Sequence, residues 1–577
     1  MRAPASLALF DQFARGWRGY MLIGLIALAS GLMGAARMPV LDRDEARFAQ
    51  ATRQMLESGD FVRIRNQNDD RNKKPIGIHW LQAAAVEAAS PLTQRLNEVW
   101  PYRLPSALGA ALAAMAAFWA GLALLPRRAA FLGAALFAAS MLLGVEGMIA
   151  KTDAVLCGLT TLAMAALARL YVRPVESGGK GLAFLFWAAL GCGVLIKGPV
   201  TPLVAALALL TIGLWEKRWA WMKPLAWWPG PLIAALIVAP WMIAIERATH
   251  GAFLSEAFGQ DLAPKLAGGQ EGHAAPFGFH LALLPFLIFP ATFVLPAAAR
   301  LGWRVARAPI DDAKNAGLRF LIAWIVPVFL AFELLPTKLP HYTLPTYPAL
   351  ALLGAAGLMA ATRERWRVTQ LIGILMFALA GAVLIAAIAL GATYMPGDSS
   401  ADLRRAITAG LLGALVLGAG IAALVFLPRP SARVGAIILA ALLLSYSLRD
   451  RILPEARTLH VSAEAAAALT RARLLPRDDR PLWVVGYRET SLVFLTRTSI
   501  RLATPAEAGE RAAIGDALIV EGRDLPAADA ELARRDLQFA RSATPVRGLN
   551  YGNGKWVALY IGEVEAGPDW VGRGRGQ

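Results

Sequence analysis

Residues 41–80 read LDRDEARFAQATRQMLESGDFVRIRNQNDDRNKKPIGIHW, a polar stretch that directly follows the first long apolar run of the chain. The stretch opens with an acidic triplet, Asp42, Asp44 and Glu45, and approaches its end at Lys74. A loop that starts next to a membrane anchor holds its carboxylates at the membrane–water boundary, and its lysine returns to the same level. This arrangement suits chemistry on the phosphate of a lipid.

The middle of this stretch predicts a short helix. Phe48 and Met55 follow one another at helical spacing among good helix formers, and Gly59-Asp60 predicts a turn after them. The apolar stripe favours a helix that lies on the bilayer surface. The alternative is a solvated outer loop whose charges only keep it in water.

The composition indicates a polytopic membrane protein. The 577 residues are 57% hydrophobic and only 17% charged, with a mean hydropathy of +0.49, more apolar surface than a water-soluble chain of this size can bury. The net charge of +17 would suggest a nucleic-acid partner in a soluble protein. Here much of the excess lies in short loops between apolar runs, so it sets the topology and no nucleic-acid partner is expected.

The apolar runs predict about thirteen transmembrane helices in a mostly α-helical fold. Their approximate limits are 18–38, 102–125, 129–147, 154–171, 181–197, 199–215, 225–245, 279–299, 318–335, 343–361, 369–393, 406–427 and 433–449. Only Lys197-Gly198-Pro199 separates the fifth run from the sixth. Counting them as one helix would move the later arginine-rich loops to the other side and break their alternation.

Alternate short loops are rich in arginine, and the positive-inside rule places those loops in the cytoplasm. The N-terminus is then cytoplasmic, and the Asp44 loop faces outward. The apolar runs stop near residue 450, so we expect a transmembrane domain over residues 1–450. Residues 451–577 are expected to form a small, outward-facing soluble α/β domain, with strands at PLWVVGY, ALIVEG and KWVALYIGEV.

Ionisable residues recur in the outward loops, beside prolines and glycines, while the transmembrane interiors are nearly free of charge. Taken singly, each would be an ordinary anchor at the end of a span. Together with loop 39–100, the loops 246–280 and 336–343 predict a site at the outer membrane boundary. Its candidate residues are the carboxylates Asp44, Glu45 and Asp153, the cations Lys74, Lys197, Lys265 and Lys338, and Tyr342.

Two alternatives within this site stay open. Asp153 could serve only as the N-terminal cap of the fourth span. Glu271 and His273 are two residues apart and could hold a divalent metal, but so few mixed ligands are a weak signal. We expect that no cofactor is required, with a metal as the alternative.

The order of the motifs resembles a known family. DEARFAQ, KKPIGIHW, a KTDA segment, IKGP and TKLPHY, found in this order between Asp44 and Tyr347, are similar to the lipid-linked-sugar glycosyltransferases of the C-type (GT-C) fold. Within them, the sequence most resembles the enzymes that transfer 4-amino-4-deoxy-L-arabinose to lipid A. The protein O-mannosyltransferases are related and also carry an acidic pair in the first outer loop.

The resemblance implies transfer of a sugar from undecaprenyl phosphate to a lipid A phosphate, with inversion, in the inner membrane of a bacterium and with the site facing the periplasm. Membrane lipids are further expected partners. The lysines and Tyr342 would bind the donor phosphate and lipid, and Asp44, Asp153 and Glu45 would act on the sugar and acceptor. Two other functions remain as alternatives, a protein O-mannosyltransferase-like enzyme and a lipid or sugar transporter. A transporter should place ionisable groups in mid-membrane and show symmetric halves, and the sequence shows neither.

Overall fold

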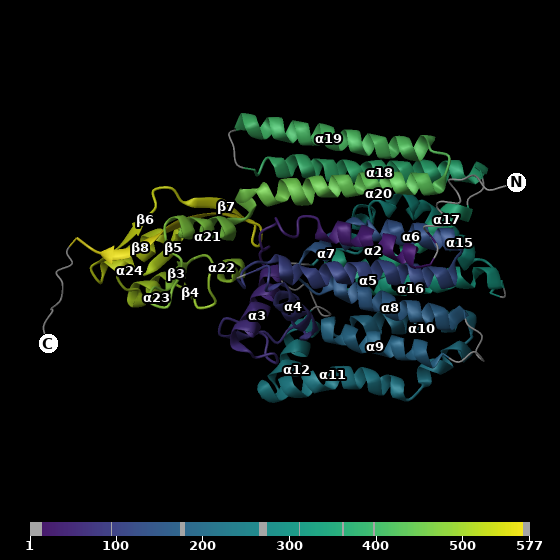
Figure 1. The fold of residues 1–577 in the computed structure, drawn as a ribbon, viewed down its shortest axis with the longest axis horizontal. Helices are drawn as coiled ribbons and strands as arrows, with labels where there is room; N and C mark the ends of the chain where they lie inside the picture. Colours follow the sequence, from purple (N-terminus) through teal and green to yellow (C-terminus); the bar gives the residue numbers. More distant parts are fainter. Residues whose placement is uncertain are drawn as a thin grey trace.

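The computed structural model describes residues 14, 16–93, 95–172, 179–264, 274–310, 312–360, 363–395 and 399–568. Most of the chain forms long helices that run side by side, and a small mixed sheet flanked by helices lies at one end of this bundle (Figure 1). Helices α3 (Asp44–Ser58) and α4 (Gly77–Ala89) belong to loop 39–100, called the outer loop after its predicted side, and lie at the same end of the bundle as the sheet (Figure 1).

The described residues contain nine helical segments long and apolar enough to cross a membrane, or up to eleven if each of two bent helix pairs counts as one span. The nine are α5 (Trp100–Leu124), α8 (Asp153–Val172), α9 (Lys180–Lys197), α11 (Pro229–Ala248), Ala313–Leu334, Pro340–Ala360, Val368–Ala392, Leu403–Phe426 and Pro430–Glu455. The bent pairs are α6 (Arg127–Ala138) with α7 (Met141–Met148), and α14 (Phe279–Leu287) with Ala291–Ala306. The chain is therefore a multi-pass membrane protein.

Two shorter apolar helices, α2 (Gly16–Leu32) and α10 (Val200–Glu216), account for the remaining predicted runs. Each of the thirteen runs thus corresponds to a helix or a bent pair, although the exact number of membrane crossings stays a prediction. The separation of the fifth run from the sixth is confirmed. Helix α9 ends at Lys197 because Gly198 takes a backbone φ of 62°, which favours glycine, and Pro199 follows it.

The later part of the bundle contains α15 (Leu295–Ala306), α16 (Ala316–Leu334), the 3₁₀ helix η6 (Pro340–Thr346) and α17 (Tyr347–Ala360). Three long helices, α18 (Arg363–Ala392), α19 (Ser399–Phe426) and α20 (Pro430–Tyr446), form a layer on one side (Figure 1). Loop 246–280 contains the short helix α12 (Ala252–Glu256).

The helix predicted inside residues 41–80 is confirmed as α3, which ends at Gly59 in a left-handed conformation. Its apolar stripe packs on protein rather than on lipid. Phe48 contacts a cluster with Ile78 and Ile196, and Met55 contacts another that includes Trp241. Strands β1 (Arg65–Asn66) and β2 (Asp69–Asp70) then form a small hairpin before α4. The outer loop is thus a packed part of the protein.

The C-terminal α/β region (residues 461–566) contains a six-stranded sheet in the order β4-β3-β5-β8-β6, with β7 also paired to β8. Strand β3 runs parallel to β4 and β5, whereas β8 is antiparallel to its three partners. The predicted strands are confirmed as β3 (Leu482–Val485), β5 (Ala517–Glu521) and β8 (Lys555–Ala566). The others are β4 (Arg501–Ala503), β6 (Leu537–Arg541) and β7 (Val546–Asn550).

Helices cover both faces of this sheet, so β3 and β5 are buried along their whole length. Helices α21 (Val461–Arg471) and α22 (Thr490–Leu495) pack on one face, and α23 (Pro505–Arg511) and α24 (Leu525–Ala533) pack on the other. A small α/β fold at the C-terminus is therefore confirmed. The boundary at residue 450 stays a prediction.

Candidate active site

The start of α3 is fixed by a buried ion pair between Glu45 and Arg103 of α5. Arg103 donates to the two carboxylate oxygens of Glu45 at 2.8 Å and 2.7 Å, and both side chains are at most 1% exposed. Glu45 also accepts hydrogen bonds from the backbone N–H groups of Leu41 and Ala150, both at 2.8 Å. Arg103 donates further to backbone carbonyls at the end of the first span, those of Ala35, Met38 and Pro39.

The catalytic role predicted for Glu45 does not fit this position. Hydrogen-bond donors occupy both of its carboxylate oxygens. The residue also lines neither of the two cavities of the site, one of which is polar and the other apolar. Its neighbour Asp44, one position earlier on the helix, lines the polar cavity. Glu45 therefore joins the Asp44 loop to the 150–152 segment, and we infer that it positions the site without touching substrate.

The side chains of two lysines and one histidine, from three separate segments, meet around Asp153, the first residue of α8. The Lys197 ammonium, at the end of α9, lies 2.5 Å from one Asp153 oxygen, and the Lys151 ammonium lies 3.6 Å from the other. The Nε2 atom of His341, from η6, lies 3.5 Å from Asp153. Asp153 is thus held between two cations, rather than serving only as a helix cap.

Glu146 of α7 completes this cluster. Its carboxylate lies 2.9 Å from the Lys151 ammonium and 3.8 Å from His341 Nδ1. Burial alone would lower the pKa of Lys151, but the carboxylates of Glu146 and Asp153 outweigh that effect and raise it. Lys151 is therefore a cation at physiological pH.

A polar cavity of ≈ 530 Å³ opens over this cluster. Five aspartates and seven basic side chains are among its described lining residues. The aspartates are Asp42, Asp44, Asp69, Asp70 and Asp153, and the basic residues are Arg43, Arg47, Arg71, Lys73, Lys74, Lys151 and Lys197. Such a chamber can hold anionic and hydroxyl- or amine-bearing groups at the same time.

An apolar cavity of ≈ 510 Å³ adjoins the polar one. Its walls come from parts of α8, α9, α10, α11, α12, the segment after α12, α16 and η6, and include Leu156, Val194, Met242, Phe253, Phe258, Phe332 and Leu344. Six residues line both cavities, namely Lys73, Lys74, Asp153, Lys197, His341 and Tyr342. The boundary between an oily pocket and a charged pocket therefore carries three lysines, the arrangement that a lipid phosphate needs.

Local sequence explains why these side chains reach the boundary. Lys74 precedes Pro75, which disfavours helix at position 74 and delays the start of α4. His341 and Tyr342 lie in the short 3₁₀ turn between Pro340 and Pro345. The Lys197 ammonium lies 5.6 Å from the centre of the Tyr342 ring, within range of a cation–π contact.

Lys338 does not join this group. Its ammonium donates to the backbone carbonyls of Ala275 and Leu335, at 3.0 Å and 2.6 Å, and it lines neither cavity. The phosphate-binding role predicted for Lys338 is therefore corrected to a structural role in fixing the 336–343 loop. Buried His280 supports the same loop, because its Nε2 atom lies 3.1 Å from the Leu339 carbonyl. Lys265, Glu271 and His273 lie outside the described residues.

The candidate list from the sequence omitted Glu146, Lys151 and His341. A usable signal existed for Glu146, since it lies in an apolar run where a carboxylate is costly without a partner. Lys151 and His341 stand in the KTDA and TKLPHY motifs, but only the folded chain shows that both face Asp153.

Glu146, Asp153 and His341 also form a group in which a metal could be considered, because one ligand atom from each lies within 4.8 Å of the others. The charges of the surroundings argue against this use. The ammonium groups of Lys151 and Lys197 already lie against both carboxylates, so a divalent cation would meet two positive charges at close range. The cluster fits a lysine-neutralised anion site better than a metal site.

Comparisons with known proteins agree with this architecture. Residues 86–252 match the family model described as dolichyl-phosphate-mannose-protein mannosyltransferase. The chain is 31% identical, over 373 residues, to the undecaprenyl phosphate-alpha-4-amino-4-deoxy-L-arabinose arabinosyl transferase of Pectobacterium carotovorum, covering 62% of this chain and 63% of that relative. A similarly named transferase 2 of Pseudomonas fluorescens is 28% identical over 382 residues, with 64% and 65% covered.

Solved structures show the same fold. A crystal structure of ArnT from Cupriavidus metallidurans bound to undecaprenyl phosphate superposes with a TM-score of 0.74 at 20% identity, over 94% of this chain and 97% of that one. The apo form of the same protein gives 0.72 at 19% identity, over 97% and 98%. The chain therefore has the fold of this ArnT structure, and its predicted resemblance to the C-type lipid-linked-sugar glycosyltransferases is confirmed.

Proposed function

We propose that this protein transfers 4-amino-4-deoxy-L-arabinose from undecaprenyl phosphate to a phosphate group of lipid A, with inversion, at the periplasmic face of a bacterial inner membrane. The observation that carries the proposal is the junction of the apolar and polar cavities at Lys74, Lys197 and Asp153. The names of the relatives support the choice of donor.

The two cavities suit the two halves of a lipid-linked sugar. The polyprenyl chain enters the apolar cavity beside Phe253 and Phe258, and the phosphate rests at the boundary near Lys74 and Lys197. The sugar then extends into the polar cavity toward Asp44. The alternation of acids and bases there can bind an amine and hydroxyl groups together.

The reaction needs cations more than a base. An oxygen of the acceptor phosphate attacks the anomeric carbon, and the bond from that carbon to the undecaprenyl phosphate oxygen breaks. The leaving phosphate gains negative charge, which Lys74 and Lys197 stabilise. The acceptor phosphate is already ionised, so no proton has to be removed from it. Asp44 can bind the amine of the sugar and stabilise positive charge at the anomeric carbon.

The role of Asp153 follows from its contacts. Its carboxylate lies between the Lys197 and Lys151 ammonium groups and next to His341. It therefore sets where these cations stand at the boundary of the cavities, and we expect Asp153→Asn to release Lys197.

Mass spectrometry of lipid A tests the proposal. Cells that lack endogenous aminoarabinose transfer would express this chain, its Asp44→Asn variant, or Glu98→Gln as a matched control. Glu98 is an exposed acid of the same outer loop that lines neither cavity. We expect lipid A to gain the mass of one aminopentose with the wild-type chain and with Glu98→Gln, but not with Asp44→Asn. Unmodified lipid A in all strains, despite an available donor, would refute the function.

A protein hydroxyl is the second candidate acceptor, because residues 86–252 match a protein mannosyltransferase family. A hydroxyl must lose its proton during attack, so this reaction needs a general base. Asp44 is the candidate for that role, because it lines the polar cavity and belongs to the acidic pair of the sequence motif. The same strains distinguish the two acceptors. Glycosylated envelope proteins together with unmodified lipid A would favour the protein acceptor.

A further inference from the structure

The C-terminal α/β region docks directly on the outer-loop helix α3. Arg53 of α3 is 7% exposed, and its guanidinium donates to the carbonyl of Phe494 at 2.6 Å and to that of Thr496 at 3.4 Å. These carbonyls lie at the end of α22, where unpaired backbone acceptors collect and a cation is favourable. The i,i+4 partner Glu57, 2.7 Å away, holds Arg53 in place.

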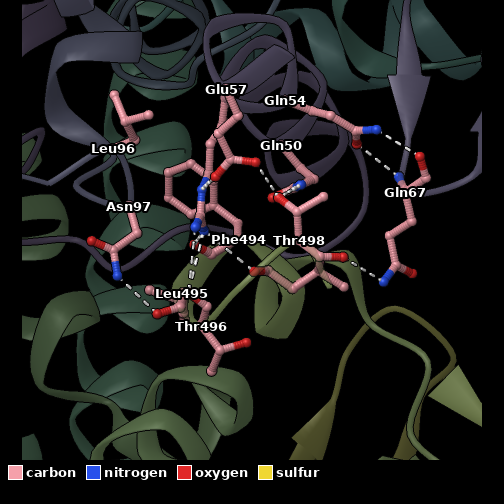
Figure 2. Close-up of polar contacts among 12 residues, drawn as sticks. Gln50, Gln54, Glu57, Gln67, Leu96, Asn97, Phe494, Leu495, Thr496 and Thr498 are labelled. Atoms are coloured by element: carbon pink, nitrogen blue, oxygen red, sulfur yellow. Dashed lines mark hydrogen bonds and ion pairs between the residues drawn. The ribbon is translucent and has the colours of Figure 1, made fainter. Parts of the chain in front are cut away.

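A second row of polar contacts extends this interface (Figure 2). Gln50 of α3 donates to the Thr498 hydroxyl at 2.9 Å, and Gln67 donates to the Thr498 carbonyl at 3.0 Å. Asn97, at the end of the outer loop, donates to the Leu495 carbonyl at 2.9 Å. The segment from α22 to β4 therefore contacts α3, the β1–β2 hairpin and the C-terminal end of the outer loop.

The interface also reaches the wall of the polar cavity. Asp42, which lines that cavity, accepts a short hydrogen bond from the Ser491 hydroxyl of α22. The backbone N–H of Asp42 donates to the Tyr551 hydroxyl at 2.6 Å. Two residues of the C-terminal region thus hold the side chain and the backbone of Asp42, only two positions before Asp44.

The backbone between Asp42 and Asp44 needs such support. Arg43 takes a φ of 62° and a ψ of −112°, a combination that residues with a side chain rarely adopt. It stands just before α3, and its side chain makes no capping hydrogen bond to the helix. The strained residue is fixed on one side by the Glu45–Arg103 pair and on the other by the Ser491 and Tyr551 contacts to Asp42.

We propose that the C-terminal α/β region is a structural part of the active site, in which Ser491 and Tyr551 are positioning residues that hold Asp42 and thereby set the place of Asp44 in the polar cavity. Neither residue lines the polar cavity, so they act through Asp42. The region thus contributes to the turnover of a reaction whose proposed phosphate-binding residues, Lys74 and Lys197, lie outside it. This inference rests on the proposed sugar transfer.

Tyr551→Phe and Ser491→Ala, made singly and together as a double variant in the full-length protein, test the assignment. Tyr551→Phe removes one hydroxyl and keeps the ring, and Asn97→Ala is the matched control, because it removes an interface hydrogen bond, to the Leu495 carbonyl, that does not involve Asp42. The measurements are kcat and KM for sugar transfer in detergent, and direct binding of undecaprenyl phosphate.

We expect the double variant to lose about tenfold in kcat, the size expected when one well-placed catalytic contact is weakened. Binding of undecaprenyl phosphate should stay at the wild-type level, because Lys74 and Lys197 are untouched. Asn97→Ala should keep the wild-type kcat.

Two outcomes overturn the inference. Wild-type kcat in the double variant shows that the contacts to Asp42 do not matter for turnover. An equal loss in Asn97→Ala, with lower phosphate binding in all variants, shows that docking only stabilises the protein as a whole. If wild-type protein itself transfers no sugar while still binding undecaprenyl phosphate, the proposed function fails instead, so the two failures are distinguishable.

Discussion

Replacing Glu45 by glutamine distinguishes a positioning role from a catalytic one. The carboxylate of Glu45 accepts four hydrogen bonds, two from Arg103 and one each from the backbone of Leu41 and Ala150. A glutamine offers one oxygen and turns an NH₂ group toward donors that have no other partner in that direction. Glu45→Gln therefore leaves a buried guanidinium without its counter-charge.

The cost can be worked out from these contacts. Removing one member of a buried ion pair destabilises a protein by about 3–5 kcal/mol. Arg103 keeps the carbonyls of Ala35, Met38 and Pro39, so the lower end of this range, about 3 kcal/mol, is expected. For a chain of this length such a loss lowers Tm by roughly 2–3 °C.

The assay compares thermal unfolding and sugar transfer in detergent for three proteins. Glu45→Gln should show a lower Tm together with lower activity. Asp44→Asn should lose activity at an unchanged Tm, since Asp44 lines the cavity. Replacing both Glu45 and Arg103 by apolar residues should restore part of the stability lost by either single change, because no unpaired charge is then buried.

A wild-type Tm for Glu45→Gln combined with abolished transfer would refute this reasoning. It would return Glu45 to the catalytic role that the acidic pair in the sequence suggested. A double variant that loses the sum of the two single losses would show that the ion pair does not couple the two helices.

Three further predictions concern phosphate binding, pH and metal. Lys74→Ala should weaken binding of undecaprenyl phosphate by about 2–4 kcal/mol, and Lys74→Arg by less because the charge survives; equal titration curves for all three proteins would place the phosphate elsewhere. Burial, opposed by the Ser491 hydrogen bond and reinforced by Glu489, raises the pKa of Asp42 to about 6. Protonation of Asp42 therefore stabilises the folded protein by up to about 3 kcal/mol, an effect that is complete below about pH 4 and lost as the pH rises through about 6. Because asparagine resembles the protonated carboxyl, Asp42→Asn should raise Tm more at pH 7 than at pH 4. Chelators should leave transfer unchanged because lysines already neutralise Asp153, and a loss that divalent metal restores would contradict this.

Local properties of the sequence were sufficient to predict the membrane fold. An apolar run of bilayer length forms a helix wherever it stands, because its backbone must hydrogen-bond within itself in lipid. The break after Lys197 also follows from adjacent residues, since Gly198 takes a positive φ and Pro199 cannot continue the helix. The period of Phe48 and Met55 predicted α3 for the same kind of reason. The spacing of these two residues could not show that the apolar stripe of α3 packs on Ile78 and Trp241 instead of on lipid.

The sequence also determined which loops carry the site, and Asp44, Asp153, Lys74, Lys197 and Tyr342 do line the cavities. The roles of neighbouring residues were decided by tertiary structure. Successive residues on a helix point about 100° apart, so the sequence alone could not tell that Glu45 turns to Arg103 while Asp44 turns to the cavity.

Tertiary structure likewise decided that Lys338 binds backbone carbonyls, and that Glu146 and His341 meet at Lys151. It also placed Ser491 and Tyr551 against Asp42, although more than four hundred residues separate them along the chain. Contacts at such separations depend on how whole helices and sheets pack. A sequence pattern reports the preferences of near neighbours, so it predicted the elements of this protein but not the partners that its charged side chains find.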